Sequence, residues 1–286
     1  SWEAAMTETP EGPVWRPPSS GELPTSRAGR PLPPPGAPPI AATRPPSGPL
    51  AAQVPLNAPA QSVSPGLGGT LQGFFWAMCG LSIVALLLAI GNLLAFNAWW
   101  DTPIGSREAD DALDDWVRVE DALQAVGGVM LIVGIVVFVL LVVWSNRAHA
   151  ASQELWLGER TWSSGWSVGG WFIPLGNAVI PKMVLDEIER IAFAVRSGGR
   201  ADEAWRTVST SAVGWVWWLA MIVGALLNVA GNRLGTELGA SAAEVRLGYV
   251  LNCVGLTVSA VGMAAGAVFV RKLTSRLTAE GLRAPT

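Results

Sequence analysis

The chain has 286 residues, of which 50% are apolar and only 14% are charged, and its formal net charge is −3. Soluble domains are about a quarter charged, so this composition indicates a membrane protein. The net negative charge argues against a nucleic-acid binder, whose footprint is strongly basic. With two Cys and one His, the chain cannot build a disulfide framework or a Cys/His metal cluster.

Residues 1–70 hold most of the prolines, including the run Pro31-Leu32-Pro33-Pro34-Pro35, and show no hydrophobic periodicity. Such a segment cannot bury enough apolar surface to offset its ordering entropy, so we expect a disordered proline-rich tail. A tail of this kind suits low-affinity binding of cytoplasmic protein partners, and a plain spacer is the alternative.

Four later stretches are long enough to cross a bilayer, whose core needs about twenty apolar residues. They cover residues 73–97, 122–145, 211–231 and 247–270, and none contains a charged residue. The sequence therefore predicts an all-α polytopic membrane protein, with a four-helix membrane domain over residues 71–275 and a short C-terminal tail over residues 276–286.

A fifth charge-free stretch, residues 161–181, is interrupted by glycines and prolines, and lipid cannot satisfy the backbone groups that they free. If the N-terminus is cytoplasmic, the inner side holds four Lys/Arg in the tail, seven between the second and third spans and four after the fourth, whereas each outer loop holds two. This agrees with the positive-inside rule. We therefore expect a cytoplasmic re-entrant or interfacial hairpin at residues 161–181, with both termini on the cytoplasmic side of the plasma membrane.

Residues 182–196, which follow this hairpin, have the pattern of an amphipathic helix. Their apolar residues fall on one face, whereas Asp186, Glu187 and Arg190 lie away from its centre. Such a helix can lie along the membrane or pack on the hairpin.

A residue pattern runs from the end of the second span into the third. Trp144-Ser145-Asn146-Arg147 ends the second span, and Trp217-Trp218 lies in the first part of the third. With the hairpin residues between them, this pattern resembles the bacterial domain-of-unknown-function 4328 family over roughly residues 75–275. The resemblance implies four membrane helices with a Trp/Phe/Pro hairpin after the second, and no particular activity. The interface candidates that it supplies are Arg147, Trp166, Trp171, Phe172, Pro174, Asn177, Pro181 and Glu187.

Arg147 has two interpretations. It can pair with Glu187, clamping the hairpin or binding a lipid phosphate through its planar donor fork. It can also be a topology anchor, which we favour because the positive-inside rule alone predicts a basic residue at a cytoplasmic helix end.

Asn92, Asn228 and Asn252 are the intramembrane polar candidates. They would line a transport path or form interhelical hydrogen bonds worth about 0.6–2 kcal/mol each. Coupled transport usually needs an ionisable residue at depth, and the four predicted spans contain none, so hydrogen bonding is favoured.

The first outer loop contains Asp110, Asp111, Asp114 and Asp115, which match an Asp-Asp-x-x-Asp diphosphate–magnesium signature. We expect a solvated extension of the second span, in which like charges at i,i+4 are destabilising and a divalent cation would relieve the repulsion. Otherwise the sequence predicts no metal and no cofactor. The single His149 is expected in a loop.

Because no catalytic motif is recognisable, the predicted function is a non-enzymatic scaffold or regulatory partner that acts at the cytoplasmic face. A small channel or transporter made of several copies of the chain is the alternative, and a lipid-handling membrane enzyme is the third possibility. The expected partners are the lipid bilayer, cytoplasmic proteins and, in a homo-oligomer, further copies of the chain.

Overall fold

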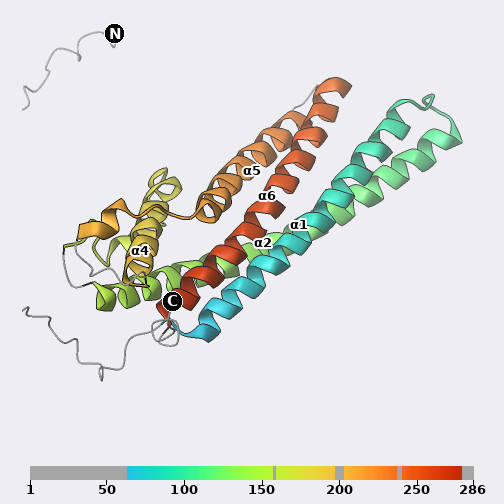
Figure 1. Ribbon diagram of the computed structural model, residues 1–286. Coiled ribbons are helices and arrows are strands. Elements are labelled where there is room, and N and C mark those ends of the chain that lie inside the picture. Colours follow the sequence, from blue (N-terminus) through green and yellow to red (C-terminus); the bar gives the residue numbers. More distant parts are fainter. Residues whose placement is uncertain (1–62, 157–158, 197–202, 237–239, 279–286) are drawn as a thin grey trace, which may run out of the picture. The chain divides into compact units, whose positions relative to one another are not determined.

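The computed structural model describes residues 63–156, 159–196, 203–236 and 240–278 (Figure 1). Residues 1–62 of the predicted disordered tail lie outside this part, and so do residues 279–286 of the C-terminal tail. The tail prediction is wrong for residues 65–70, which form the first turns of α1. All regular structure in the described ranges is helical. Its elements are α1 (Pro65–Trp100), α2 (Arg107–Leu155), α3 (Trp166–Gly169), η1 (Gly176–Ala178), α4 (Ile180–Arg196), η2 (Glu203–Thr207), α5 (Ala212–Thr236) and α6 (Ala242–Leu277).

Four of these helices, α1, α2, α5 and α6, are long and apolar enough to cross a membrane. The chain is therefore a multi-pass membrane protein, and each of these four helices overlaps one of the four predicted spans. The helices continue beyond the charge-free stretches because charged residues are tolerated once a helix leaves the apolar core. Helix α2 shows this most clearly, since it includes the aspartate-rich segment at its start and His149 near its end.

Local signals explain where the long helices begin. Helix α1 begins at Pro65, whose missing N–H costs nothing in a first turn. Ser106 caps α2 by accepting a hydrogen bond from the Ala109 amide at 3.1 Å. Ser241 and Glu244 form a reciprocal capping box at the start of α6.

The spanning helices pack in the order α5, α6, α1, α2. Small residues allow α5 and α6 to approach closely: a Cβ atom on Gly248 would lie 2.7 Å from the Gly231 carbonyl oxygen, and one on Gly224 would lie 3.1 Å from that of Gly255. Close contact of this kind through glycines is typical of membrane helix pairs.

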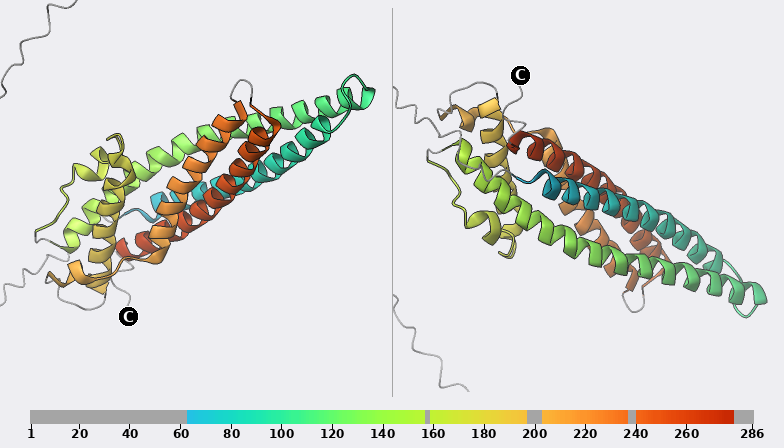
Figure 2. Two further views of the ribbon diagram at one scale, coloured as in Figure 1. Left: turned by 90° about the horizontal axis from the view of Figure 1, so that it is seen from above. Right: turned by 90° about the horizontal axis from the view of Figure 1, so that it is seen from below.

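The segment between α2 and α5 does not form a fifth span. Instead, α3, η1, α4 and η2 gather at one end of the long helices, where α4 packs against α2 and α6 (Figures 1 and 2). We call the described residues of this segment, 159–196 and 203–207, the platform. The predicted hairpin, residues 161–181, consists of turns with the short helices α3 and η1, and α4 begins at Ile180 rather than at residue 182.

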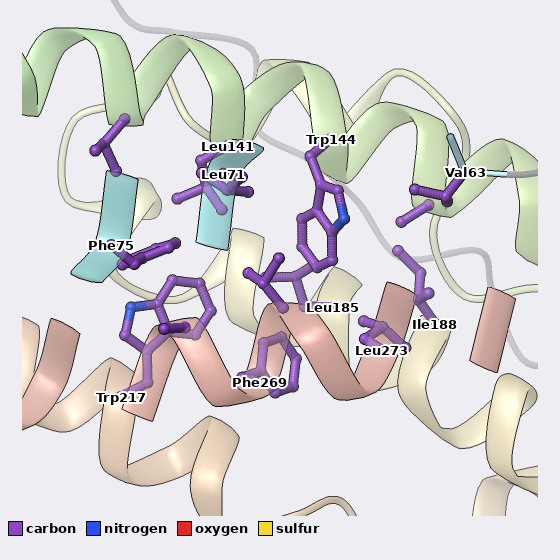
Figure 3. Packing of buried hydrophobic residues seen from close by; sticks show 14 of the residues in the cluster. Val63, Leu71, Phe75, Leu141, Trp144, Leu185, Ile188, Trp217, Phe269 and Leu273 are labelled. Atoms are coloured by element: carbon purple, nitrogen blue, oxygen red, sulfur yellow. The ribbon is translucent and has the colours of Figure 1, made fainter. Parts of the chain in front are cut away.

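One apolar cluster joins the platform to the bundle. Figure 3 shows Trp144 of α2 among Leu185 of α4, Phe269 of α6 and their neighbours. Trp144 is completely buried, and its indole N–H donates to Thr274 Oγ1 at 3.0 Å. The platform is therefore part of the folded core and not an appendage.

Candidate functional site

Glu187 of α4 fastens the start of the platform to the end of α2. Its carboxylate accepts hydrogen bonds from Arg160 Nε at 3.1 Å and from the Thr161 amide at 3.0 Å. Arg160 also donates to Ser152 Oγ of α2 at 2.9 Å. The Arg160 and Glu187 side chains are only 10% and 5% exposed, so water screens this ion pair weakly.

Glu189, two residues further along α4, fastens the other end of the connecting segment. It accepts a hydrogen bond from the Ser211 amide at 3.2 Å, directly before α5, and lies 3.8 Å from Arg276 Nη1 of α6. The two carboxylates thus bind backbone amides where the platform begins and where α5 begins.

Lys182 and Asp186 form a third buried ion pair, within α4 itself. The Lys182 ammonium lies 4.1 Å from the centre of the Trp215 ring, a cation–π contact. Burial raises the pKa of the Asp186 carboxyl above its ordinary value, and the hydrogen bond from Lys182 opposes this shift.

These contacts correct the amphipathic-helix prediction. Val184, Leu185 and Ile188 are buried as expected, but the charged Asp186 and Glu187 are buried as well. The surface of α4 instead exposes apolar side chains, among them Met183 and Phe193. Partners from other elements make this possible, because buried charges are tolerated only when they are paired and hydrogen-bonded.

A chain of aromatic rings connects the platform to the spanning helices. Trp171, just after α3, meets Trp218 of α5 edge to face at 5.9 Å between ring centres, and Trp218 meets Trp217 in the same way at 5.5 Å. Trp217 stacks on Phe269 of α6 at 5.3 Å. Phe138 of α2 meets the other side of Trp171 at 6.1 Å.

These rings surround a cavity of about 480 Å³ between α2 and α5. The lining residues are Phe75, Met78, Gly134, Val137, Phe138, Leu141, Trp171, Asn177, Ala178, Trp217, Trp218, Met221, Ile222, Ala225 and Met263. The Trp218 indole donates to the Ala178 carbonyl at 2.7 Å, whereas those of Trp171 and Trp217 have no acceptor among the described residues. The lining of the cavity is thus almost entirely apolar.

Comparison with protein families covers most of this arrangement. The model of the family described as "Domain of unknown function (DUF4328)" matches residues 108–275, from the first turn of α2 almost to the end of α6. The chain belongs to the DUF4328 family. No curated protein and no solved structure matches it. The resemblance inferred from the Trp/Phe/Pro pattern is therefore confirmed, and the DUF4328 match includes the platform and most of the cavity lining.

The candidates drawn from that pattern occupy different environments within the DUF4328 region. Trp171 and Asn177 line the cavity, and Phe172 packs edge to face against Phe138 at 5.8 Å between ring centres. Pro181 is buried in the first turn of α4, and Trp166 packs against Trp162. Pro174 is exposed.

Arg147 is exposed on α2, and Glu187 binds Arg160 in its place. The suggested Arg147–Glu187 pair is therefore wrong, because the partner of Glu187 is Arg160. His149 also differs from expectation, because it is buried inside α2 and not in a loop; its Nε2 lies 3.2 Å from the Trp162 carbonyl, to which it donates.

The intramembrane asparagines fall into two groups. Asn92 of α1 donates to the Glu120 carboxylate of α2. Asn252 donates to Asn232 Oδ1 across the α5–α6 pair at 3.0 Å, and Asn228 donates to the Gly224 carbonyl of its own helix. Asn228, Asn232 and Asn252 also line a second cavity of about 310 Å³.

Asp110, Asp111, Asp114 and Asp115 are exposed on the first turns of α2, which is the helical extension that we expected. Arg118 forms an ion pair with Asp115 at 2.8 Å. In the part of the chain that the structure describes, no three His, Cys, Asp or Glu side chains are grouped so that they could hold a metal ion.

Sequence reasoning missed Arg160, Glu189 and Arg276 as parts of the site. A signal existed only for the Lys182–Asp186 pair, whose i,i+4 spacing on a helix is readable from sequence. The other pairs join residues far apart in the chain, and nothing in their local sequence marks them.

Proposed function

We propose that this protein is a non-enzymatic scaffold or regulatory protein of the plasma membrane and that it meets its partners at the cytoplasmic face. The fixed geometry of the platform supports this proposal, since Glu187 binds a backbone amide where the platform begins and Glu189 binds one just before α5. A surface that is already ordered loses little conformational entropy when a partner binds.

The point at which the chain enters the bundle is the observation that carries the proposal. Val63 follows the proline-rich residues directly, and it is completely buried in the cluster that contains Leu185 and Ile188 of α4. The described part of the chain therefore begins beside the platform, and we propose that one partner contacts both the platform and the proline-rich sequence.

Photo-crosslinking in cells tests this function. A crosslinking amino acid at Gln153, exposed near the end of α2, is compared with one at Ile104, exposed in the α1–α2 loop. We expect position 153 to give defined protein adducts, and we expect fewer of them after deletion of residues 1–62. Position 104 should give none of these adducts. The same adducts with and without the tail would contradict a role of the tail in recruitment.

The proposed orientation places the platform and both termini in the cytoplasm, because most Lys and Arg residues then lie inside. Single cysteines at positions 104 and 153, in a chain with Cys79 and Cys253 replaced by Ala, test it with a membrane-impermeant maleimide. We expect labelling of intact cells at position 104 only. Labelling at position 153 in intact cells would reverse the orientation.

A small oligomeric channel or transporter is the second candidate, and the cavity lined by Asn228, Asn232 and Asn252 favours it. Asn228→Leu and Asn252→Leu should then abolish ion flux into liposomes, with Asn92→Leu tested beside them. Flux that persists in these variants would reject a polar path through this cavity.

A further inference from the structure

The turns between α3 and α4 expose a group of large apolar side chains. Leu175 is 90% exposed, Phe172 is 65% exposed and Val179 is 55% exposed. Ile173, which lies between them in sequence, is exposed as well. Water disfavours such a group, which is typical of a surface that meets a partner or a membrane.

Leu175, the most exposed of these residues, has a strained backbone. Its φ is 62° and its ψ is −37°, and the Gly176 amide donates to the Pro174 carbonyl at 2.7 Å. This conformation is close to the γ-turn with positive φ, which is rare and strained, whereas glycine adopts positive φ freely. Strain of this kind at an exposed leucine indicates that the side chain itself has a role.

A contact with α2 shows how deep these turns lie in the membrane. Phe172 meets Phe138 of α2 edge to face at 5.8 Å between ring centres. Phe138 is separated from the exposed Arg147 by about 13.5 Å along the helix. A basic residue at the end of a spanning helix lies at the level of the lipid headgroups, and half of a bilayer core is about 15 Å. Phe172 therefore lies at the depth of the acyl chains.

A contact with α5 also places the turns below the headgroups. The Trp218 indole donates to the Ala178 carbonyl at 2.7 Å. Trp218 lies about 9 Å along α5 from the first residue of that helix, Ala212. The two spanning helices on either side of the turns thus agree on their depth.

The exposed side of the turns is continuous with the outer surface of the bundle. Trp171 and Ala178 belong to the lining of the cavity between α2 and α5, so one side of the segment faces the helices. Next to Phe138, the outer surface of α2 exposes Ile135 and Val139. In a multi-pass membrane protein such a surface faces hydrocarbon, and Phe172 extends it onto the platform.

The backbone of these turns is largely satisfied within the hairpin, as lipid requires. Six of the eight amide N–H groups of residues 171–179 donate to carbonyl oxygens of the hairpin itself. Irregular backbone at membrane depth is tolerated only where its polar groups find partners in the protein. These turns therefore meet the main condition for entering a leaflet.

We propose that residues 171–179 form a re-entrant segment that enters the leaflet next to the platform, and that Phe172, Ile173, Leu175 and Val179 contact lipid acyl chains there. A cytoplasmic protein cannot reach side chains at this depth, so lipid is the partner that fits them. The segment is separate from the surface that we propose for protein partners.

Spin labels test this insertion. The full chain, with Cys79 and Cys253 replaced by Ala, carries one labelled cysteine and is reconstituted into phosphatidylcholine–phosphatidylglycerol vesicles. Collisions are measured with oxygen, which concentrates in hydrocarbon, and with a neutral nickel chelate that is present in the water on both sides. The references are Ile135→Cys, on the outer surface of α2, and Gln153→Cys, exposed near the end of α2.

We expect Leu175→Cys and Val179→Cys to behave like Ile135→Cys, with frequent oxygen collisions and few nickel collisions. Nickel collisions as frequent as at position 153 would show that the turns lie in water and would overturn the proposal. Few collisions with either reagent would also overturn it, because another protein surface, such as a second copy of the chain, would then cover the segment.

A charged substitution tests whether the apolar side chain at position 175 holds the segment in the leaflet. A carboxylate is costly in hydrocarbon, so Leu175→Asp should increase nickel collisions of the label at position 179. Ile104→Asp is the control, because Ile104 is fully exposed in the α1–α2 loop, and it should leave these collisions unchanged. Equal collision rates in the two variants would overturn the role of Leu175.

Discussion

Replacing Glu187 should release the platform from the end of α2. Glu187→Ala removes the acceptor of both Arg160 Nε and the Thr161 amide, and it leaves a nearly buried guanidinium without its carboxylate. Removing one partner of a buried ion pair costs about 3–5 kcal/mol, so we expect a loss of this size in the free energy of opening the platform. Glu187→Gln keeps one acceptor oxygen and should cost about 1–3 kcal/mol.

Hydrogen exchange followed by mass spectrometry measures this opening in the purified full chain. Because each 1.4 kcal/mol changes an equilibrium constant tenfold, the Ala variant should accelerate exchange of the α4 amides by roughly 10²- to 4 × 10³-fold. The α5–α6 contact lies outside this ion pair and provides an internal reference.

The exposed Asp115–Arg118 pair provides the matched control. Its side chains are 69% and 75% exposed, and exposed pairs contribute about 0–1 kcal/mol, so Asp115→Ala should change exchange several-fold at most. If Glu187→Ala accelerates exchange of α4 no more than Asp115→Ala does, burial of the Arg160–Glu187 pair does not hold the platform, and the reasoning is refuted.

Two further predictions concern helix contact and pH. Gly248→Ala should cost about 1–3 kcal/mol, because its Cβ would lie 2.7 Å from the Gly231 carbonyl; Gly80→Ala, with open space around it, should leave the thermal midpoint nearly unchanged. Because burial raises the pKa of the Asp186 carboxyl above its ordinary value of 3.8, the folded protein binds this proton more tightly than the unfolded chain does. The resulting stability is full below pH 3.8 and is lost as the pH rises through the raised pKa. Asp186→Asn should remove this dependence, and a pH-independent difference between the midpoints of the two proteins would contradict it.

The four spans could be predicted because a helix that crosses the bilayer core needs about twenty apolar residues in a row. Their ends were less predictable, because a helix ends where backbone signals end it and not where charge begins. Residues 107–121 contain many charges but no Pro or Gly, so α2 includes them, whereas Pro103 and Gly105 lie in the turn between α1 and α2.

The site was predictable only in its local part. Trp171 and Asn177 belong to the Trp/Phe/Pro pattern, and both line the cavity. The apolar residues that line the rest of the cavity, such as Met221 and Val137, could not be identified from sequence. An apolar residue in a span can face lipid, another helix or a cavity, and the sequence does not distinguish these. Likewise, the Arg160–Glu187 pair depends on the tertiary fold, and the sequence suggested Arg147 as a partner of Glu187 only as the less favoured of two interpretations.

The buried carboxylates of α4 connect the platform to segments that line the cavity. An interfacial helix would turn its carboxylates toward water, yet Glu187 and Glu189 face inward, and each binds a backbone amide outside α4. The Thr161 amide lies ahead of the turns that carry Trp171, and the Ser211 amide lies one residue before the helix that carries Trp217. Both unpaired indoles therefore sit on segments whose starting points α4 fixes. The buried charges thus fix the segments that carry these two rings of the cavity lining, which hydrophobic packing alone, being non-directional, would not specify.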